Sequence, residues 1–281
     1  MICHSGYLQA AATVEVADDR GRIFTFQAPP QRIITLTPHL TELLYLMEGG
    51  DRLVATVEFS NYPPAAQSVP RIGNYERLDM EQLLALKPDL VLGWDGGNPS
   101  AMLDRIEKLG LPLFRVVTAT LEDVARGMRQ VGALLGHRGR GEAASVRFLA
   151  ELQQLQGRYR ERRAVKVFYQ LWHQPIMTLE SGGVIEDVIA RCGGESLFSG
   201  LKGIAPTVSE EAVLAAAPEV IIAAGMGQKR PQWLDNWRRW QSLPAVQGEH
   251  LYSLDPDLIH RQGPRILQGM RTICEAIDRA R

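Results

Sequence analysis

The chain has 281 residues, 45% of them hydrophobic and 22% charged, as in soluble globular proteins, which allows one large domain or two of about 100 to 150 residues. Its formal net charge of −1 provides no general attraction to nucleic acid, so we expect no nucleic-acid partner. No apolar run approaches the roughly 20 residues that span a bilayer, which excludes an integral membrane role.

The first twelve residues, MICHSGYLQAAA, end in a small-residue triplet like that of a signal peptidase site. They lack the basic and apolar regions that precede such a site. A truncated export signal and a plain tail therefore fit this segment equally well.

The three cysteines, Cys3, Cys192 and Cys274, form no CxxC motif, so they indicate neither a zinc site nor a disulfide framework. We predict that Cys192 and Cys274 are core thiols. A single bridge between them remains open if the compartment is oxidising.

Strand and helix patterns alternate along the chain. TVEV and RIFTF, separated by residues 18–21, predict a hairpin, and RIITL at Arg32–Leu36 predicts a buried strand. Helical and β-branched runs then alternate up to a helix at Leu121–Leu135. This order is typical of an α/β fold with a mostly parallel sheet.

A long helical pattern at residues 142–162 is followed by a second β/α series that starts at Val165. The expected organisation is therefore two similar α/β lobes flanking one helix. We assign residues 1–12 to a tail or signal remnant, 13–139 to an N-terminal lobe, 140–163 to the connecting helix and 164–281 to a C-terminal lobe.

One segment occurs twice. EQLLALKPDLVLG at residues 81–93 and EAVLAAAPEVIIA at 211–223 both fit E-x-x-L-A-x-x-P-[DE] followed by apolar residues. Each predicts a helix, a proline-bounded turn and a buried strand, with Glu81 and Glu211 in the first turn of the helix. Because small-molecule sites form preferentially where two domains meet, we expect a ligand cleft between the lobes.

The chain resembles the helical-backbone class of ABC-transporter binding proteins, and within it the periplasmic cobalamin-binding proteins of Gram-negative bacteria. The resemblance runs from about Arg32 to Ala280 and is carried by SNYPPAAQ, LALKPDLVLGWDGGN, CGGESLF and PRIL. It implies two Rossmann-like lobes joined by a long rigid helix, a periplasmic location, a monomer and an inner-membrane permease as partner. It also implies that Glu81 and Glu211 pair with arginines of the permease, for which exposed carboxylates are suited.

The resemblance also implies where a corrinoid would bind. A corrin is broad and flat, so its pocket needs aromatic or apolar plates and a few polar groups. Phe59 falls at a corrin-contacting aromatic position of the family, Tyr75 stands where tryptophan is usual, and Trp94 follows a strand, the general location of ligands in α/β lobes.

In the second lobe, Trp172 and His173 follow a strand, and DLIHR matches a polar loop of the family. That loop comprises Asp257, Leu258, Ile259, His260 and Arg261. The family's tryptophan before VSxE is Ala205 here, which thins the aromatic clamp. Trp233, Trp237 and Trp240 have helical spacing that indicates packing or a surface stripe, so we leave them out of the site.

We therefore expect a corrinoid-binding transport receptor that holds no cofactor of its own and no metal, although His173 is a possible metal ligand. Haem or a ferric siderophore is the alternative ligand for the same fold. A chelatase-like enzyme is less favoured, because the sequence has no GxGxxG after the first strand and no P-loop, HExxH or GxSxG motif. A scaffold that uses the two glutamates for another partner is the third hypothesis.

Overall fold

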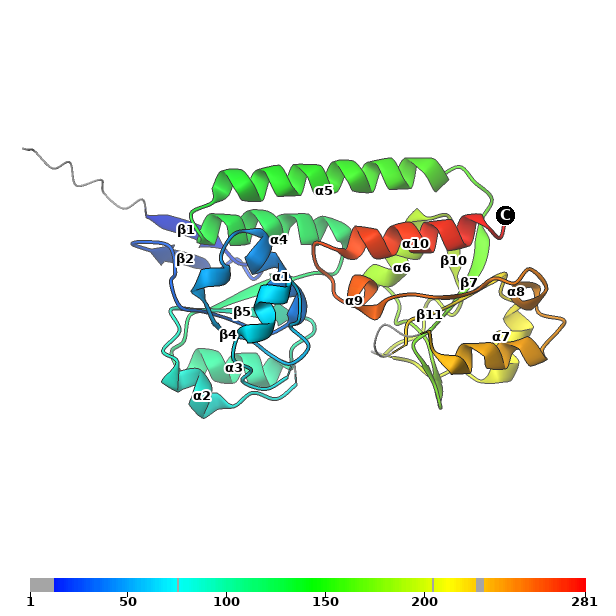
Figure 1. Cartoon of the computed structure of the whole chain (residues 1–281), viewed down its shortest axis with the longest axis horizontal. Helices are drawn as coiled ribbons and strands as arrows, with labels where there is room; N and C mark the ends of the chain where they lie inside the picture. Colours follow the sequence, from blue (N-terminus) through cyan, green and yellow to red (C-terminus); the bar gives the residue numbers. More distant parts are fainter. Residues whose placement is uncertain (1–12, 75, 204, 226–229) are drawn as a thin grey trace, which may run out of the picture. The chain divides into compact units, whose positions relative to one another are not determined.

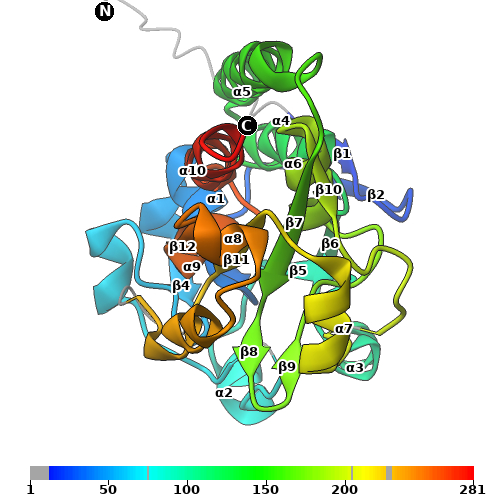
Figure 2. The same ribbon diagram turned by 90° about the vertical axis from the view of Figure 1, so that its right-hand side faces the viewer.

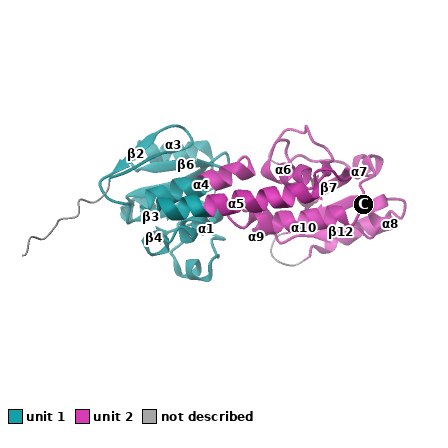
Figure 3. Cartoon of the chain, turned by 90° about the horizontal axis from the view of Figure 1, so that it is seen from above, with its two compact units in different colours: residues 1–117, 127–143 teal, residues 118–126, 144–281 magenta. Residues whose placement is uncertain are grey.

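The computed structural model describes residues 13–74, 76–203, 205–225 and 230–281. It divides into two compact units, shown in teal and magenta in Figure 3. Unit 1 comprises the described residues up to Val117 together with Gly127–Ala143, and unit 2 comprises Thr118–Arg126 and Ala144–Arg281. The predicted tail at residues 1–12 lies outside the described residues.

The predicted hairpin is confirmed at the start of unit 1. Strands β1 (Val14–Ala17) and β2 (Ile23–Phe26) pair antiparallel with Val14 opposite Phe26. Buried and exposed residues alternate along β1, as expected for a ribbon that packs one face on the protein. Gly21 takes a φ of 78° in the turn, a conformation that glycine adopts without steric cost.

Unit 1 is built on a four-stranded parallel sheet of order β4-β3-β5-β6. Its strands are β3 (Ile33–Thr35), β4 (Leu53–Ala55), β5 (Leu90–Asp95) and β6 (Leu113–Val117). The sequences of these strands are runs of mostly apolar residues, because β3 and the first four residues of β5 are buried. The helical segments of this part of the chain are α1 (Pro38–Leu46), η1 (Gly50–Arg52), η2 (Pro64–Ser68), α2 (Met80–Ala85) and α3 (Ser100–Lys108).

Unit 2 repeats this plan with a parallel sheet of order β10-β7-β11-β12. Its strands are β7 (Val165–Gln170), β10 (Gly194–Ser196), β11 (Val220–Ala223) and β12 (Leu251–Ser253), and a small antiparallel hairpin is formed by β8 (Trp172–His173) and β9 (Ile176–Met177). The helical segments are α6 (Val184–Arg191), α7 (Glu210–Ala216), η3 (Gln232–Arg239), α8 (Pro244–Gln247), α9 (Pro256–Ile259) and α10 (Ile266–Asp278). Figure 2 shows the β8–β9 hairpin next to α7.

The sequence repeat corresponds to a structural repeat. Helix α2 leads into β5 and helix α7 leads into β11, and each of these strands is third in its sheet order. Glu81 and Glu211 are each the second residue of their helix. The predicted α/β class with parallel sheets is thereby confirmed.

Two long helices follow the first sheet in the chain (Figure 1). Helix α4 (Leu121–Leu134) ends one residue before the predicted Leu135, and α5 (Arg138–Tyr159) has 22 residues. The connecting helix was predicted at 140–163, so α5 begins two residues earlier and ends four residues earlier. Its residues up to Ala143 group with unit 1, and those from Ala144 group with unit 2.

The prediction of two core thiols is wrong in one respect, because Cys192 and Cys274 form a disulfide bond. Both residues are fully buried, as predicted. Cys192 directly follows α6, and Cys274 lies within α10, which packs against α6. The single bridge that the sequence left open is therefore the one that forms. Sequence spacing could not decide between it and free thiols, because 82 residues separate the two cysteines and only the packing of the helices brings them together.

Candidate functional site

Trp94 lies near the carboxyl end of β5 and is partly exposed. The indole contacts the ring of His39 edge-to-face, with ring centroids 5.0 Å apart and planes at 88°. His39 is 3% exposed and belongs to α1, the helix that follows β3. The core of unit 1 thus supports one side of an aromatic ring that still reaches the surface.

The loop after Trp94 is shaped to hold this ring. The Asn98 side chain accepts a hydrogen bond from the Trp94 backbone N–H (2.8 Å) and donates one to the carbonyl of Leu36 (3.2 Å). A Cβ atom added at Gly97 would lie 1.8 Å from the Trp94 indole. Glycine is therefore required at 97, which gives the WDGGN motif a physical reason.

Asp95, the residue after Trp94, is held by two arginines of unit 1. It pairs with Arg20 of the β1–β2 turn at 2.6 Å and with Arg115 of β6 at 3.6 Å. The hydrogen bond from Arg20 is the main cause that keeps the pKa of Asp95 below its ordinary value. Ionised Asp95 thus ties the strand end that carries Trp94 to the N-terminal hairpin.

Phe59 is the most exposed of the predicted aromatic residues that the structure describes, with 71% of its surface accessible. It adopts a φ of 63°, which is uncommon for a bulky residue. The turn is anchored underneath by a hydrogen bond of 2.9 Å from the Thr56 hydroxyl to that of Ser60. The predicted site residue Tyr75 lies outside the described residues.

In unit 2, Trp172 and His173 form β8, and both are partly exposed. Their ring centroids are 5.0 Å apart. His173 also stacks on Trp233, with centroids 5.6 Å apart and planes only 10° from parallel. Nδ1 of His173 is buried and has no hydrogen-bond partner among the described residues.

Trp233 is thus an aromatic neighbour of the site that sequence reasoning left out. The predicted helical stripe is a 3-10 helix, η3, in which Trp237 is buried and donates a hydrogen bond of 2.8 Å to the Gln170 side chain. Packing is confirmed for Trp237. No sequence signal connects Trp233 with His173, because their contact depends on how η3 packs beside the β8–β9 hairpin.

The DLIHR segment forms α9 and the residues that follow it. Asp255 caps this short helix by accepting a hydrogen bond of 2.9 Å from the Asp257 N–H. Asp257 pairs with Arg261 at 2.8 Å, and the Arg261 side chain is only 8% exposed. Leu258 is partly exposed, whereas Ile259 is fully buried, so its side chain serves the core of unit 2.

His260 shares a hydrogen bond of 3.0 Å with the hydroxyl of Tyr169, which is buried in β7. Part of the His260 surface is exposed, but the protein packed around the ring disfavours its charged form and lowers the pKa to about 4, against the opposing effect of Asp257. Burial also raises the pKa of Tyr169. Both groups are therefore uncharged at neutral pH and present a polar but neutral pair.

Glu81 and Glu211 are both exposed. Asp79 caps α2 by accepting hydrogen bonds from the N–H groups of Glu81 and Gln82, and Ser209 caps α7 from the equivalent position. Hydrogen bonds from the Glu211 backbone and then from Ser209 keep the pKa of Glu211 below its ordinary value. Both units thus present an exposed carboxylate at the same point of the repeat.

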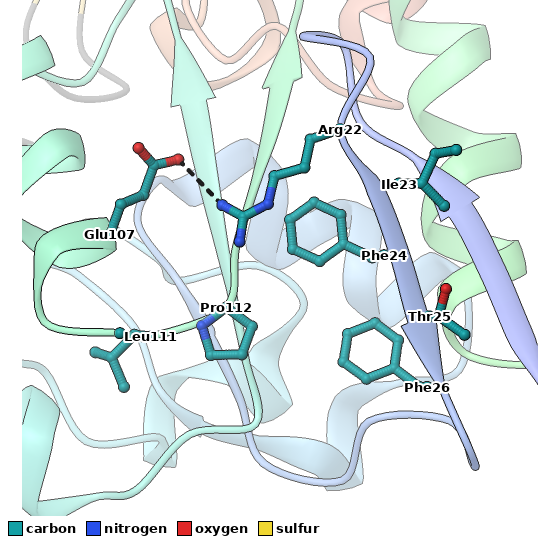
Figure 4. Close-up of a pocket in the computed structure, with 9 residues that line it drawn as sticks. Arg22, Ile23, Phe24, Thr25, Phe26, Glu107, Leu111 and Pro112 are labelled. Atoms are coloured by element: carbon teal, nitrogen blue, oxygen red, sulfur yellow. Dashed lines mark ion pairs between the residues drawn. The ribbon is translucent and has the colours of Figure 1, made fainter.

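A cavity of about 300 Å³ at the N-terminal hairpin is lined by other residues (Figure 4). Phe24 and Phe26 of β2 line it, and Arg22 pairs across it with Glu107 of α3 at 3.6 Å.

In the part of the chain that is described, no cluster of three or more His, Cys, Asp or Glu side chains could hold a metal ion. Over the same residues, no helix is long and apolar enough to cross a membrane.

Two α/β units, each built on a four-stranded parallel sheet, follow one repeated plan, and the comparison with protein families assigns this architecture to a class of binding proteins. The model of the family described as "Periplasmic binding protein" matches residues 33–258. The chain belongs to this family.

Curated relatives are named vitamin B12-binding proteins. The one from Vibrio parahaemolyticus is 35% identical over 253 residues, which cover 89% of this chain and 90% of the relative. The one from Pectobacterium carotovorum is 31% identical over 252 residues and covers 89% of both chains.

Solved structures show the same fold. The periplasmic vitamin B12-binding protein BtuF of Vibrio cholerae superimposes with a TM-score of 0.83 at 34% identity, covering 90% of this chain and 98% of that one. The periplasmic heme-binding protein RhuT of Roseiflexus sp. RS-1 reaches a TM-score of 0.78 at 24% identity, covering 89% and 99%. At that lower identity the likeness concerns the fold alone.

Proposed function

We propose that the chain captures cobalamin in the periplasm and delivers it to an ABC permease of the inner membrane. The observation that carries this proposal is the similarity to vitamin B12-binding proteins, which extends at 35% identity over about nine-tenths of both chains. The structure of such a protein also matches this fold with a TM-score of 0.83. Cobalamin is the transported ligand and not a resident cofactor.

The described residues support a flat, amide-bearing ligand. Unit 1 offers the exposed ring of Phe59 on a turn and the partly exposed ring of Trp94 near the end of β5, and buried contacts hold both in place. An aromatic face in this position suits the plane of a corrin. Tyr75 remains a predicted third contact of the same unit.

Unit 2 offers Trp172 and His173 on β8 and the Asp257–Arg261 pair. Because the two charges of that ion pair neutralise each other, the pair can hydrogen-bond to amide side chains without favouring a charged ligand. Leu258 can add an apolar contact, while His260 adds a neutral polar one. His173 as a metal ligand remains a secondary hypothesis, since cobalamin brings its own lower base.

Glu81 and Glu211 are proposed as the contacts to the permease. Their support is that both are exposed, both occupy the second position of the repeated helix, and neither forms an ion pair with another described residue. An exposed carboxylate in a defined orientation can form a bidentate pair with an arginine of a partner. We expect the chain to act as a monomer, without catalytic activity and without a nucleic-acid partner.

Retention of a coloured ligand tests the proposed function. The purified chain is mixed separately with cyanocobalamin, cobinamide, haemin and a ferric siderophore, and each mixture is passed through a gel-filtration column. We expect the cyanocobalamin chromophore to elute with the protein. Co-elution of haemin or the siderophore without either corrinoid would replace the proposal with its same-fold alternative.

A further inference from the structure

Unit 1 has a pocket of about 460 Å³ that is lined in part by Met80, the residue before Glu81. It is lined by Glu76, Arg77, Leu78, Met80, Ala101, Met102 and Arg105. Met80 is the first residue of α2, and the last three lining residues belong to α3. The pocket therefore adjoins the helix that carries the proposed docking glutamate.

The pocket is lined by two cationic side chains, Arg77 and Arg105. Arg77 and Arg105 are exposed, and neither side chain forms an ion pair or a hydrogen bond with another described residue. Elsewhere on α3, in contrast, Asp104 and Glu107 are both paired with Arg115. Glu76 at the rim makes no ion pair with either arginine, so the pocket keeps a net positive charge.

Most of the other side chains that line the pocket are apolar, and three of these pack on the core of unit 1. Leu78, Met80 and Met102 are partly buried and pack on the hydrophobic core of unit 1. Methionine side chains adapt to the shape of a bound group, and a guanidinium matches the geometry of a carboxylate. The lining thus suits one acidic side chain together with its methylene stem.

The two copies of the repeat differ at the residue that lines this pocket. In the aligned repeat, the residue before Glu211 is Glu210, which pairs with Arg239. The equivalent residue in unit 1 is Met80, which lines the pocket. The surfaces around the two docking glutamates therefore differ in charge and in shape.

We propose that this pocket receives an acidic side chain from the periplasmic face of the permease, next to the contact made by Glu81. The proposal rests on the docking role proposed above, and the complementary charge of the arginines selects an acidic protein segment as the occupant. The contact would lie on unit 1 and would add to the one proposed for Glu81.

Charge reversal tests this proposal. The full chain carrying Arg77→Glu and Arg105→Glu is titrated against its cognate permease in lipid nanodiscs, and the dissociation constant of the complex is measured together with that for cyanocobalamin. We expect docking to weaken about tenfold or more, with cobalamin affinity unchanged. Docking at wild-type affinity overturns the proposal.

Two further variants separate docking from folding. Lys108→Glu reverses a charge in the last turn of α3, the helix that carries Arg105, and Lys108 does not line the pocket. The dissociation constant of the complex should therefore change by less than about twofold. An equal loss with Lys108→Glu would mean that net charge alone is responsible and would overturn the proposal. Arg77→Gln with Arg105→Gln, which introduces no repulsion, should still weaken docking about threefold or more.

Failure of the pocket proposal can be distinguished from failure of the docking role proposed for Glu81 and Glu211. If Glu81→Ala with Glu211→Ala abolishes docking while the arginine variants dock normally, the pocket proposal fails and the glutamate role stands. If all of these variants dock normally, both proposals fail. Replacing an acidic residue of a periplasmic permease loop with arginine should restore docking of the charge-reversed chain, and failure of every such replacement would count against the pocket.

Discussion

Single residues around Trp94 show how much of the proposed site depends on close packing. The tryptophan could be selected from its place after a strand, but its orientation is determined by Asn98, His39 and Gly97. Phe59 is a parallel case, because its positive φ and its exposure become visible only in the folded turn. Residue type thus gives the chemistry of the site, and neighbouring residues give its geometry.

Gly97→Ala is expected to weaken cobalamin binding about tenfold or more, because the new methyl group would overlap the indole and displace Trp94. The measurement is a fluorescence or absorbance titration with cyanocobalamin. Gly157→Ala in α5, where a Cβ meets no atom within 4 Å, is the matched control and should bind normally. Unchanged affinity of Gly97→Ala would remove Trp94 from the proposed site.

At the scale of elements, the repeated helix–turn–strand unit accounts for the similarity of the two sheets. The helices α2 and α7 are short, and each is defined by a capping side chain before it and a proline-bounded turn after it. The contacts between elements are less regular, since α6 and α10 are joined by a disulfide that has no counterpart among the described residues of unit 1.

Cys192→Ser with Cys274→Ser is expected to lower the free energy of unfolding by about 2 to 5 kcal/mol, because the bond closes a loop of 82 residues and its removal frees the unfolded chain. Chemical denaturation of the oxidised wild type and of the variant provides the comparison. Treatment with a reductant should destabilise only the wild type. A variant as stable as the oxidised protein would show that the bond contributes nothing measurable.

At the scale of the whole molecule, delivery requires functions that lie on different parts of the chain. The proposed ligand contacts involve loops and strand ends, whereas Glu81 and Glu211 lie on short helices. None of the proposed ligand residues belongs to α2 or α7. Ligand capture and permease docking should therefore be separable by mutation.

Glu81→Ala with Glu211→Ala is expected to abolish cobalamin uptake while leaving ligand affinity unchanged, because the substitutions remove two exposed carboxylates and no buried contact. Uptake by cells that lack the native protein and binding by the purified variant are the two measurements. The matched control is Glu249→Gln, an exposed acid outside both helices. Normal uptake by the double variant would refute the docking role.

The sequence by itself determined the α/β class, the repeated unit and the positions of Trp94, Glu81 and Glu211, because apolar periodicity, prolines and capping residues act locally and can be read along the chain. The tertiary structure alone decided which distant residues meet. It joined Cys192 to Cys274, stacked Trp233 on His173, buried Ile259 and brought Arg77 and Arg105 together in one pocket. Such contacts depend on how elements pack, and no local pattern encodes them.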